Sequence, residues 1–215
     1  MGIVFGKIPA PTPKHEVIHS TNDYEIRKYP PSVVAEVTYD PAQFNSDKDG
    51  GFTILGNYIG ALGKPQNQTP EPIAMTAPVI TKAAAAEKIA MTAPVITKAA
   101  AAEKIAMTAP VVTQGGGGEL VIMTFILPSK YVKAEEAPRP VDERVVIREE
   151  GEKKYGVVRF SGVAGEEVVT KKAENLKGCL ERDGFKVAGD FVLARYNPPF
   201  TLPPFRTNEV MIPVE

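Results

Sequence analysis

Runs of alternating apolar and polar residues, many of them β-branched, predict strands along much of the chain. These runs cover residues 24–29, 32–39, 120–127, 145–150, 155–161, 187–196 and 209–213. The first two flank Pro30 and Pro31, so we expect two strands that meet at a corner. The runs on either side of Gly151 are predicted to form a hairpin.

Two segments have the spacing of amphipathic helices instead. The first predicted helix lies between Asp49 and Gly63, and the second covers residues 166–183. The apolar stripe of the first is Phe52, Leu55, Ile59 and Leu62. The stripe of the second is Val169, Ala173, Leu176 and Leu180. Gly184 follows the second helix at the position where a glycine commonly ends a helix.

The order strand, strand, helix, strand therefore occurs twice. Two such halves can pair into one antiparallel sheet or open barrel with two helices outside, which is an α+β architecture. We expect residues 1–12 to be an N-terminal tail and residues 13–215 to form a single domain.

A short repeat interrupts the first half. The sequence Ile-Ala-Met-Thr-Ala-Pro-Val begins at Ile73, Ile89 and Ile105, with a period of 16 residues. Each copy has the composition of a strand, and its proline favours an edge or a bulge. One copy supplies one barrel strand, so residues 73–114 are predicted to contain an insertion. The other copies would form an extra meander or an excursion from the body. The last copy, joined through Gly115–Gly118 to the next strand, is expected to form a hairpin with it.

The charge balance excludes some classes of partner. Lys plus Arg is 25 and Asp plus Glu is 26, a net charge of −1, which argues against nucleic-acid binding and against a polybasic membrane anchor. Cys179 is the single cysteine, so no intramolecular disulfide can form. Without a signal-peptide pattern or a membrane-spanning apolar run, the chain is expected to be cytoplasmic. The sequence has no nucleophile elbow and no phosphate-binding glycine loop, so we expect no enzymatic activity.

Several motifs point to one family in combination. They are Tyr-Glu-Ile-Arg at 24–27, Asp-Gly-Gly-Phe at 49–52, Ala-Met-Thr-Ala-Pro-Val at 74–79, Tyr-Asn-Pro-Pro at 196–199 and Arg-Thr-Asn-Glu at 206–209. The chain resembles the SOUL haem-binding family over residues 13–213, and its plant cytosolic members most closely. The resemblance implies a distorted antiparallel β-barrel, built from a duplicated half and flanked by two helices. It also implies binding of haem and related tetrapyrroles in a shallow apolar cleft beside the first helix.

A haem site needs an apolar face for the disc and donors or cations near the two carboxylates. The first predicted helix offers such a face, made of Phe52, Leu55, Gly56, Ile59 and Gly60. Gly56 and Gly60 lie on one stripe with Phe52, which predicts either close approach of a flat ligand or close packing of the helix on the sheet. Lys64 is the nearest cation, just after the helix.

The proline-rich segment 197–206 is a second candidate wall. Phe200, Leu202 and Phe205 give it apolar surface, and its prolines stiffen it. Arg206 at its end has two interpretations, pairing with a haem propionate or bonding to backbone carbonyls of its own loop.

Neither histidine is a firm iron ligand. His15 and His19 are four residues apart, roughly 13 Å along a strand, so they cannot bind the same iron. His19 remains a candidate ligand, and binding without any axial ligand is the main hypothesis.

The sequence therefore predicts a carrier or buffer that binds haem and porphyrins reversibly and without covalent attachment. One alternative is an effector-binding module for bulky apolar cations, which would need a carboxylate aimed into the pocket. The sequence shows no clear carboxylate for that role, although Glu36 and Glu209 lie in predicted strands. Another alternative is a protein-interaction role for the repeats.

Overall fold

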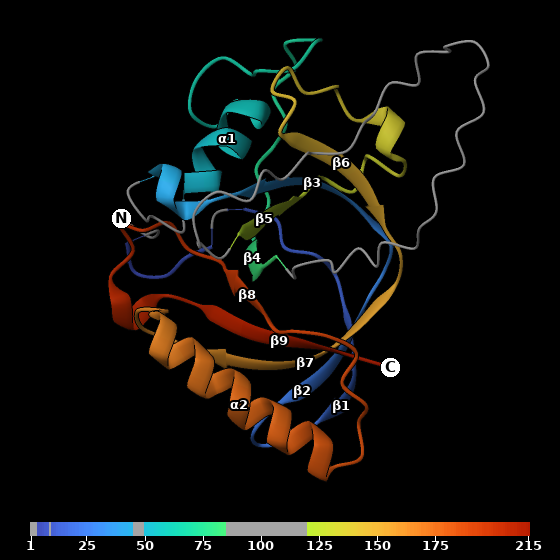
Figure 1. Cartoon of the computed structure of the whole chain (residues 1–215), viewed down its shortest axis with the longest axis vertical. Coiled ribbons are helices and arrows are strands. Elements are labelled where there is room, and N and C mark those ends of the chain that lie inside the picture. The colour runs from blue at the N-terminus through green and yellow to red at the C-terminus, as the bar shows by residue number, and fades with distance from the viewer. Residues whose placement is uncertain (1–3, 9, 45–49, 85–119) are drawn as a thin grey trace, which may run out of the picture.

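The computed structural model describes residues 4–8, 10–44, 50–84 and 120–215. In these residues one curled antiparallel sheet carries two α-helices on its outside, so the α+β prediction is confirmed (Figure 1). The strands are β1 (Glu16–Ser20), β2 (Glu25–Tyr29), β3 (Ser32–Tyr39), β4 (Val79–Ala83), β5 (Val121–Ile126), β6 (Val145–Glu150), β7 (Lys153–Phe160), β8 (Val192–Arg195) and β9 (Asn208–Val214). The helices are α1 (Gly50–Ile59) and α2 (Glu166–Arg182), with short 3-10 turns η1 (Pro41–Phe44), η2 (Ala134–Glu136) and η3 (Pro203–Phe205).

The strand order shows the duplication directly. The sheet runs β1-β2-β7-β9-β8-β4-β5-β3-β6. The strands β2, β3, β4 and β5 correspond to β6, β7, β8 and β9. When each strand is replaced by its counterpart, the order of these eight strands is the original order reversed. Each half is therefore strand, strand, helix, strand, strand, and the pair of β4 and β8 lies at the centre of the pseudo-symmetry.

The predicted hairpin around Gly151 is wrong. Strand β6 pairs with β3, whereas β7 pairs with β2 and β9, so the chain crosses at Gly151 from one half of the sheet to the other. The Pro30–Pro31 corner makes the equivalent crossing between β2 and β3. As a result, β2 of the first half pairs with β7 of the second, and β6 of the second half pairs with β3 of the first. Alternation fixes where a strand lies along the chain, but long-range pairing decides its neighbour.

The strand alternation separates two faces of the sheet. Helix α1 covers the outer face of β3, β5 and β6, and α2 covers that of β7 and β9 (Figure 1). The core under α1 contains Val37, Leu55 and Phe125, and the core under α2 contains Ile26, Leu180 and Val210. A third cluster lies on the inner, concave face, and its buried members are Val157, Val192, Ala194 and Met211.

Both helices end at a glycine for the same conformational reason. Gly60 and Gly184 each have a φ of +83°, which residues with a Cβ rarely adopt. After α1, Ala61 N–H donates to Gly56 O at 2.8 Å and Gly60 N–H to Asn57 O at 3.2 Å. This Schellman pattern stops α1 at Ile59, so the predicted continuation to Leu62 is wrong. The prediction for α2, including its four buried positions, is confirmed.

The first repeat copy supplies β4. Strand β5 has β4 on one side and β3 on the other, so both its edges are filled. Beyond β4 and β5, Ala84 N–H donates to Leu120 O at 2.8 Å, which closes the ends of the segment between them. The second and third copies, and the predicted hairpin of the third, lie outside the described residues.

The N-terminal residues contact the body at several points. Leu202 N–H donates to Val4 O at 3.1 Å, Asn197 Nδ2 to Gly6 O at 3.2 Å, and Ala77 N–H to Pro11 O at 3.0 Å. In the described part of the chain, neither α-helix combines the length and apolarity needed to cross a membrane.

Candidate functional site

The apolar residues of α1 point mainly toward the sheet. Leu55 has 0% and Ile59 has 2% of its surface exposed, and both belong to the core under α1. Phe52 is half-buried, and its ring centroid lies 5.5 Å from that of Phe125. Of the three, Phe52 alone is partly open to solvent.

The two glycines of α1 have different roles. Gly60 is accounted for by its positive φ, so its lack of a side chain needs no ligand. A Cβ on Gly56 would lie 3.0 Å from the Leu62 side chain, which folds back over the helix after the turn. Leu62 is 52% exposed and Lys64 is exposed beyond it. Phe52, Gly56 and Leu62 thus form a small apolar surface with a cation at its end, which we call the α1 surface.

The second candidate wall lies away from the α1 surface. Phe200, Leu202 and Phe205 are all exposed, and the Phe5 ring contacts Phe205 at 5.7 Å. The loop is tied to the start of α2, where Gly162 N–H donates to Pro203 O at 2.9 Å. Figure 1 shows α1 at one end of the molecule and this loop beside the start of α2. The two walls therefore do not enclose one cleft.

Arg206 binds its own loop. Its Nε donates to Thr201 O at 2.7 Å and its Nη2 to Pro199 O at 2.5 Å. This is the second of the two sequence interpretations, in which the guanidinium supports a rigid loop.

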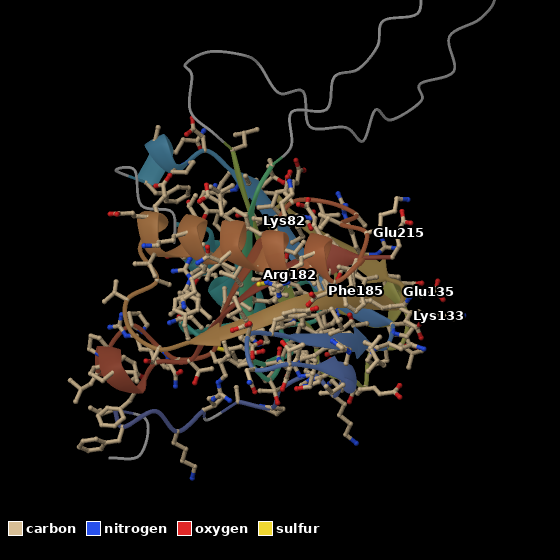
Figure 2. The ribbon with its side chains drawn as sticks, turned by 90° about the horizontal axis from the view of Figure 1, so that it is seen from below. Lys82, Lys133, Glu135, Arg182, Phe185 and Glu215 are labelled. Carbon is tan, nitrogen blue, oxygen red and sulfur yellow. The ribbon has the colours of Figure 1, made fainter. Side chains whose placement is uncertain are left out.

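The histidines are surface residues near the edge strand β1. The His19 ring lies 5.5 Å from Phe185, which follows α2 (Figure 2), and the His15 ring lies 5.2 Å from Tyr29. Among the described residues, no group of three or more His, Cys, Asp or Glu side chains is placed to hold a metal ion.

The inner face of the sheet contains a cavity that the sequence analysis missed. Its volume is about 580 Å³, and none of the ten haem-binding candidates lines it. Its walls include Ile80, Val192 and Met211 together with the rings of Tyr29, Tyr155 and Tyr196. A polar depression of about 750 Å³ adjoins it and shares Lys153, Tyr155 and Val192; Lys82 and Glu215 of its rim are labelled in Figure 2. The residues that could have indicated the cavity are the alternate positions of each strand, whose side chains point away from the helices.

Two ion pairs neutralise the buried carboxylates of the inner face. Arg27 Nη1 lies 2.9 Å from Glu209 Oε1, and Tyr196 donates to the other Glu209 oxygen at 2.6 Å. At the opposite end of the sheet, Arg148 Nη2 on β6 lies 3.3 Å from Glu36 Oε1 on β3. Both glutamates are buried, so the inward carboxylates that an effector-binding module would need are present but already paired.

The three tyrosines of this face are half-buried. Burial raises the pKa of Tyr29, although the neighbouring Arg27 guanidinium opposes the shift. Burial likewise raises the pKa of Tyr155, and burial together with Glu209 raises that of Tyr196. All three phenols are therefore protonated hydrogen-bond donors at neutral pH. The Tyr29 hydroxyl is buried without a hydrogen bond of normal geometry to any described residue.

The fold and these surfaces define a duplicated α+β protein whose curled sheet carries helices outside and a ligand-sized cavity inside. The chain belongs to the SOUL heme-binding protein family, whose model matches residues 10–87 and 97–213. Membership assigns haem or a related tetrapyrrole as the non-covalent ligand. No curated protein matches the chain.

Solved structures share the fold at low sequence identity. The EcmrR C-terminal domain has a TM-score of 0.53 at 10% identity, over 89% of this chain and 98% of that one. EcmrR in its DNA-bound complex gives 0.52 at 10% identity, over 89% of this chain and 57% of that one. An uncharacterised conserved protein from Listeria innocua gives 0.51 at 12% identity, covering 96% and 94% of the two chains. These likenesses show the fold alone.

The gap in the family match gives a prediction for the repeats. Residues 88–96, most of the middle copy, fall between the two matched segments. Deleting one period, Ile89–Lys104, should leave stability and haem affinity nearly unchanged, because β4 and β5 keep their partners. Shortening a loop by about half changes its closure free energy by only about 0.6 kcal/mol. Urea unfolding and a haem titration check this, and an insoluble or non-binding product would contradict it.

Proposed function

We propose that this chain is a reversible carrier or buffer of haem and porphyrins that holds the disc on the α1 surface. The observation that carries the proposal is the family match across both halves of the chain. The α1 surface supports the location, because half-buried Phe52 and exposed Leu62 offer apolar contact and Lys64 stands free in solvent beyond them. Of the other candidates, Leu55 and Ile59 would support this surface from beneath, and Gly56 would leave room for the Leu62 side chain that covers the helix.

The proline-rich loop is retained as a separate candidate contact. Phe200, Leu202 and Phe205 are exposed and rigidly held, which suits a flat apolar ligand. Arg206 would act there by holding the loop in shape. We further propose that the protein acts in the cytoplasm and performs no catalysis of its own.

Metal-free protoporphyrin should bind nearly as well as haem. The proposal gives the iron no protein ligand, so removing it should change affinity by less than about tenfold, or about 1.4 kcal/mol. Titrations followed by porphyrin absorbance and by tyrosine quenching, since the chain has no tryptophan, measure both affinities. Tight haem binding with undetectable protoporphyrin binding would show that an axial ligand is essential.

The variant Leu62→Asp should weaken haem binding at least tenfold. The change places a carboxylate under the apolar disc, where it has no partner and repels the propionates. Because Leu62 is 52% exposed, the fold should survive the substitution. The matched control is Val168→Asp on α2, which is 45% exposed and should leave haem binding unchanged. Equal haem affinities for the two variants would show that the α1 surface is not part of the haem site.

A further inference from the structure

We propose that the inner-face cavity is a second binding site, for an uncharged, flat, apolar molecule that carries a hydrogen-bond acceptor. The cavity volume of about 580 Å³ lies within the usual range for small-molecule sites, roughly 300–1,000 Å³. Its central wall lies on the face of the sheet opposite α1, and no residue of the α1 surface lines it, so its occupation does not depend on the haem proposal.

The walls of the cavity suit an apolar occupant. Ile80 on β4 and Met211 on β9 lie on the two strands that flank β8 at the centre of the sheet. Both belong to the same apolar cluster as the three tyrosines. The rim includes Pro13, Pro30, Pro31 and Pro128. A rim stiffened by prolines keeps the hollow open without much loss of entropy on binding. Filling it would remove apolar wall area from water, which favours binding.

Tyr29 supplies the polar anchor. The Tyr29 ring lines the cavity, and its buried hydroxyl lies beside the Arg27 guanidinium, which can only donate to it. The phenolic O–H therefore has no acceptor of normal geometry among the described residues. The raised pKa of Tyr29 keeps the phenol protonated, so the group is available as a donor. A ligand carbonyl that accepts this hydrogen bond would satisfy it.

The charges around the cavity select against ions. Glu209 is paired with Arg27, Glu36 with Arg148, and the lining residue Glu150 lies 2.6 Å from Lys153. A bulky cation would therefore find no unneutralised carboxylate among these groups. The lining cation Lys14 is exposed at the rim, where water screens it. An uncharged ligand avoids the cost of burying a charge without a partner.

Nile red is a suitable probe for the full-length protein. It is uncharged, flat and apolar, carries a carbonyl oxygen, and fluoresces more strongly in apolar surroundings. We expect saturable binding of one dye per chain. Tetraphenylphosphonium, a bulky cation, should not displace the dye, and haem should bind without displacing it. Displacement by either ligand, or a signal that does not saturate, would overturn the proposal.

Two cavity variants locate the dye. Ile80→Trp places an indole in the hollow and should weaken dye binding at least tenfold, whereas Val168→Trp on exposed α2 should not. Tyr29→Phe should weaken it about threefold to tenfold through loss of one hydrogen bond. Its control is Tyr131→Phe, a lining residue whose hydroxyl contacts Glu71 instead.

Circular dichroism shows whether each variant is folded before its dye affinity is interpreted. If Ile80→Trp does not fold, the comparison of Tyr29→Phe with Tyr131→Phe decides the outcome. Unchanged dye affinity in folded Tyr29→Phe and Ile80→Trp would place the dye outside the cavity and overturn the proposal. The variant Leu62→Asp should lose haem and keep the dye, so failure of the haem proposal remains distinguishable.

Discussion

Replacing Leu55 with aspartate should lower the free energy of unfolding by about 4 kcal/mol or more. Leu55 has no exposed surface and packs in the core between α1 and the sheet. The substitution removes a buried apolar side chain, worth about 1.5–3 kcal/mol. It also leaves a carboxyl group without a partner in an apolar environment, a further cost of several kcal/mol unless the group becomes protonated.

Urea unfolding followed by circular dichroism measures the Leu55→Asp effect. The matched control is Leu62→Asp, which carries the same chemical change at an exposed position and should cost less than about 1 kcal/mol. An unchanged unfolding midpoint for Leu55→Asp would mean that Leu55 is open to solvent. Because unfolding abolishes any site, lost haem binding in Leu55→Asp would say nothing about contact with the ligand.

Replacing Arg27 with methionine should cost about 3–5 kcal/mol of stability. Arg27 joins β2 to β9 through Glu209, and the Glu209 side chain is only 4% exposed. Removing the guanidinium leaves that carboxylate buried, with the Tyr196 hydroxyl as its remaining hydrogen-bond partner among the described residues. The cost arises mainly from the uncompensated buried charge, and less from the attraction lost.

A double variant separates these two contributions. Arg27→Met with Glu209→Gln removes both charges and keeps an amide oxygen to accept the Tyr196 hydrogen bond. We expect it to recover most of the loss. Lys28→Met on the same strand breaks the exposed pair with Glu152 and should cost less than about 1 kcal/mol. If the double variant is as unstable as Arg27→Met, the methionine itself, and not the unpaired carboxylate, causes the loss.

The sequence predicted the local elements well where one pattern dominated. Helix α2 has a single apolar stripe and an ending glycine, and both its bounds and its buried face agree with the prediction. Helix α1 was predicted too long because Leu62 continues the helical spacing after the chain has turned at Gly60. Spacing alone cannot distinguish a residue on the next helical turn from one that folds back onto it.

The amino-acid sequence by itself determined most of the strands, the helices, the family and the duplicated order of elements, because each depends on local patterns or recognisable motifs. Strand β1 (Glu16–Ser20) was not among the predicted strands. The tertiary structure decided which strands pair, and so replaced the hairpin at Gly151 with a crossing between halves. It also decided that Arg206 binds its own loop and that Tyr29, Tyr155 and Tyr196 meet around one cavity. These results depend on contacts between residues far apart in the chain. Alternation gives each strand two faces, but only the curl of the paired sheet determines which face encloses a space.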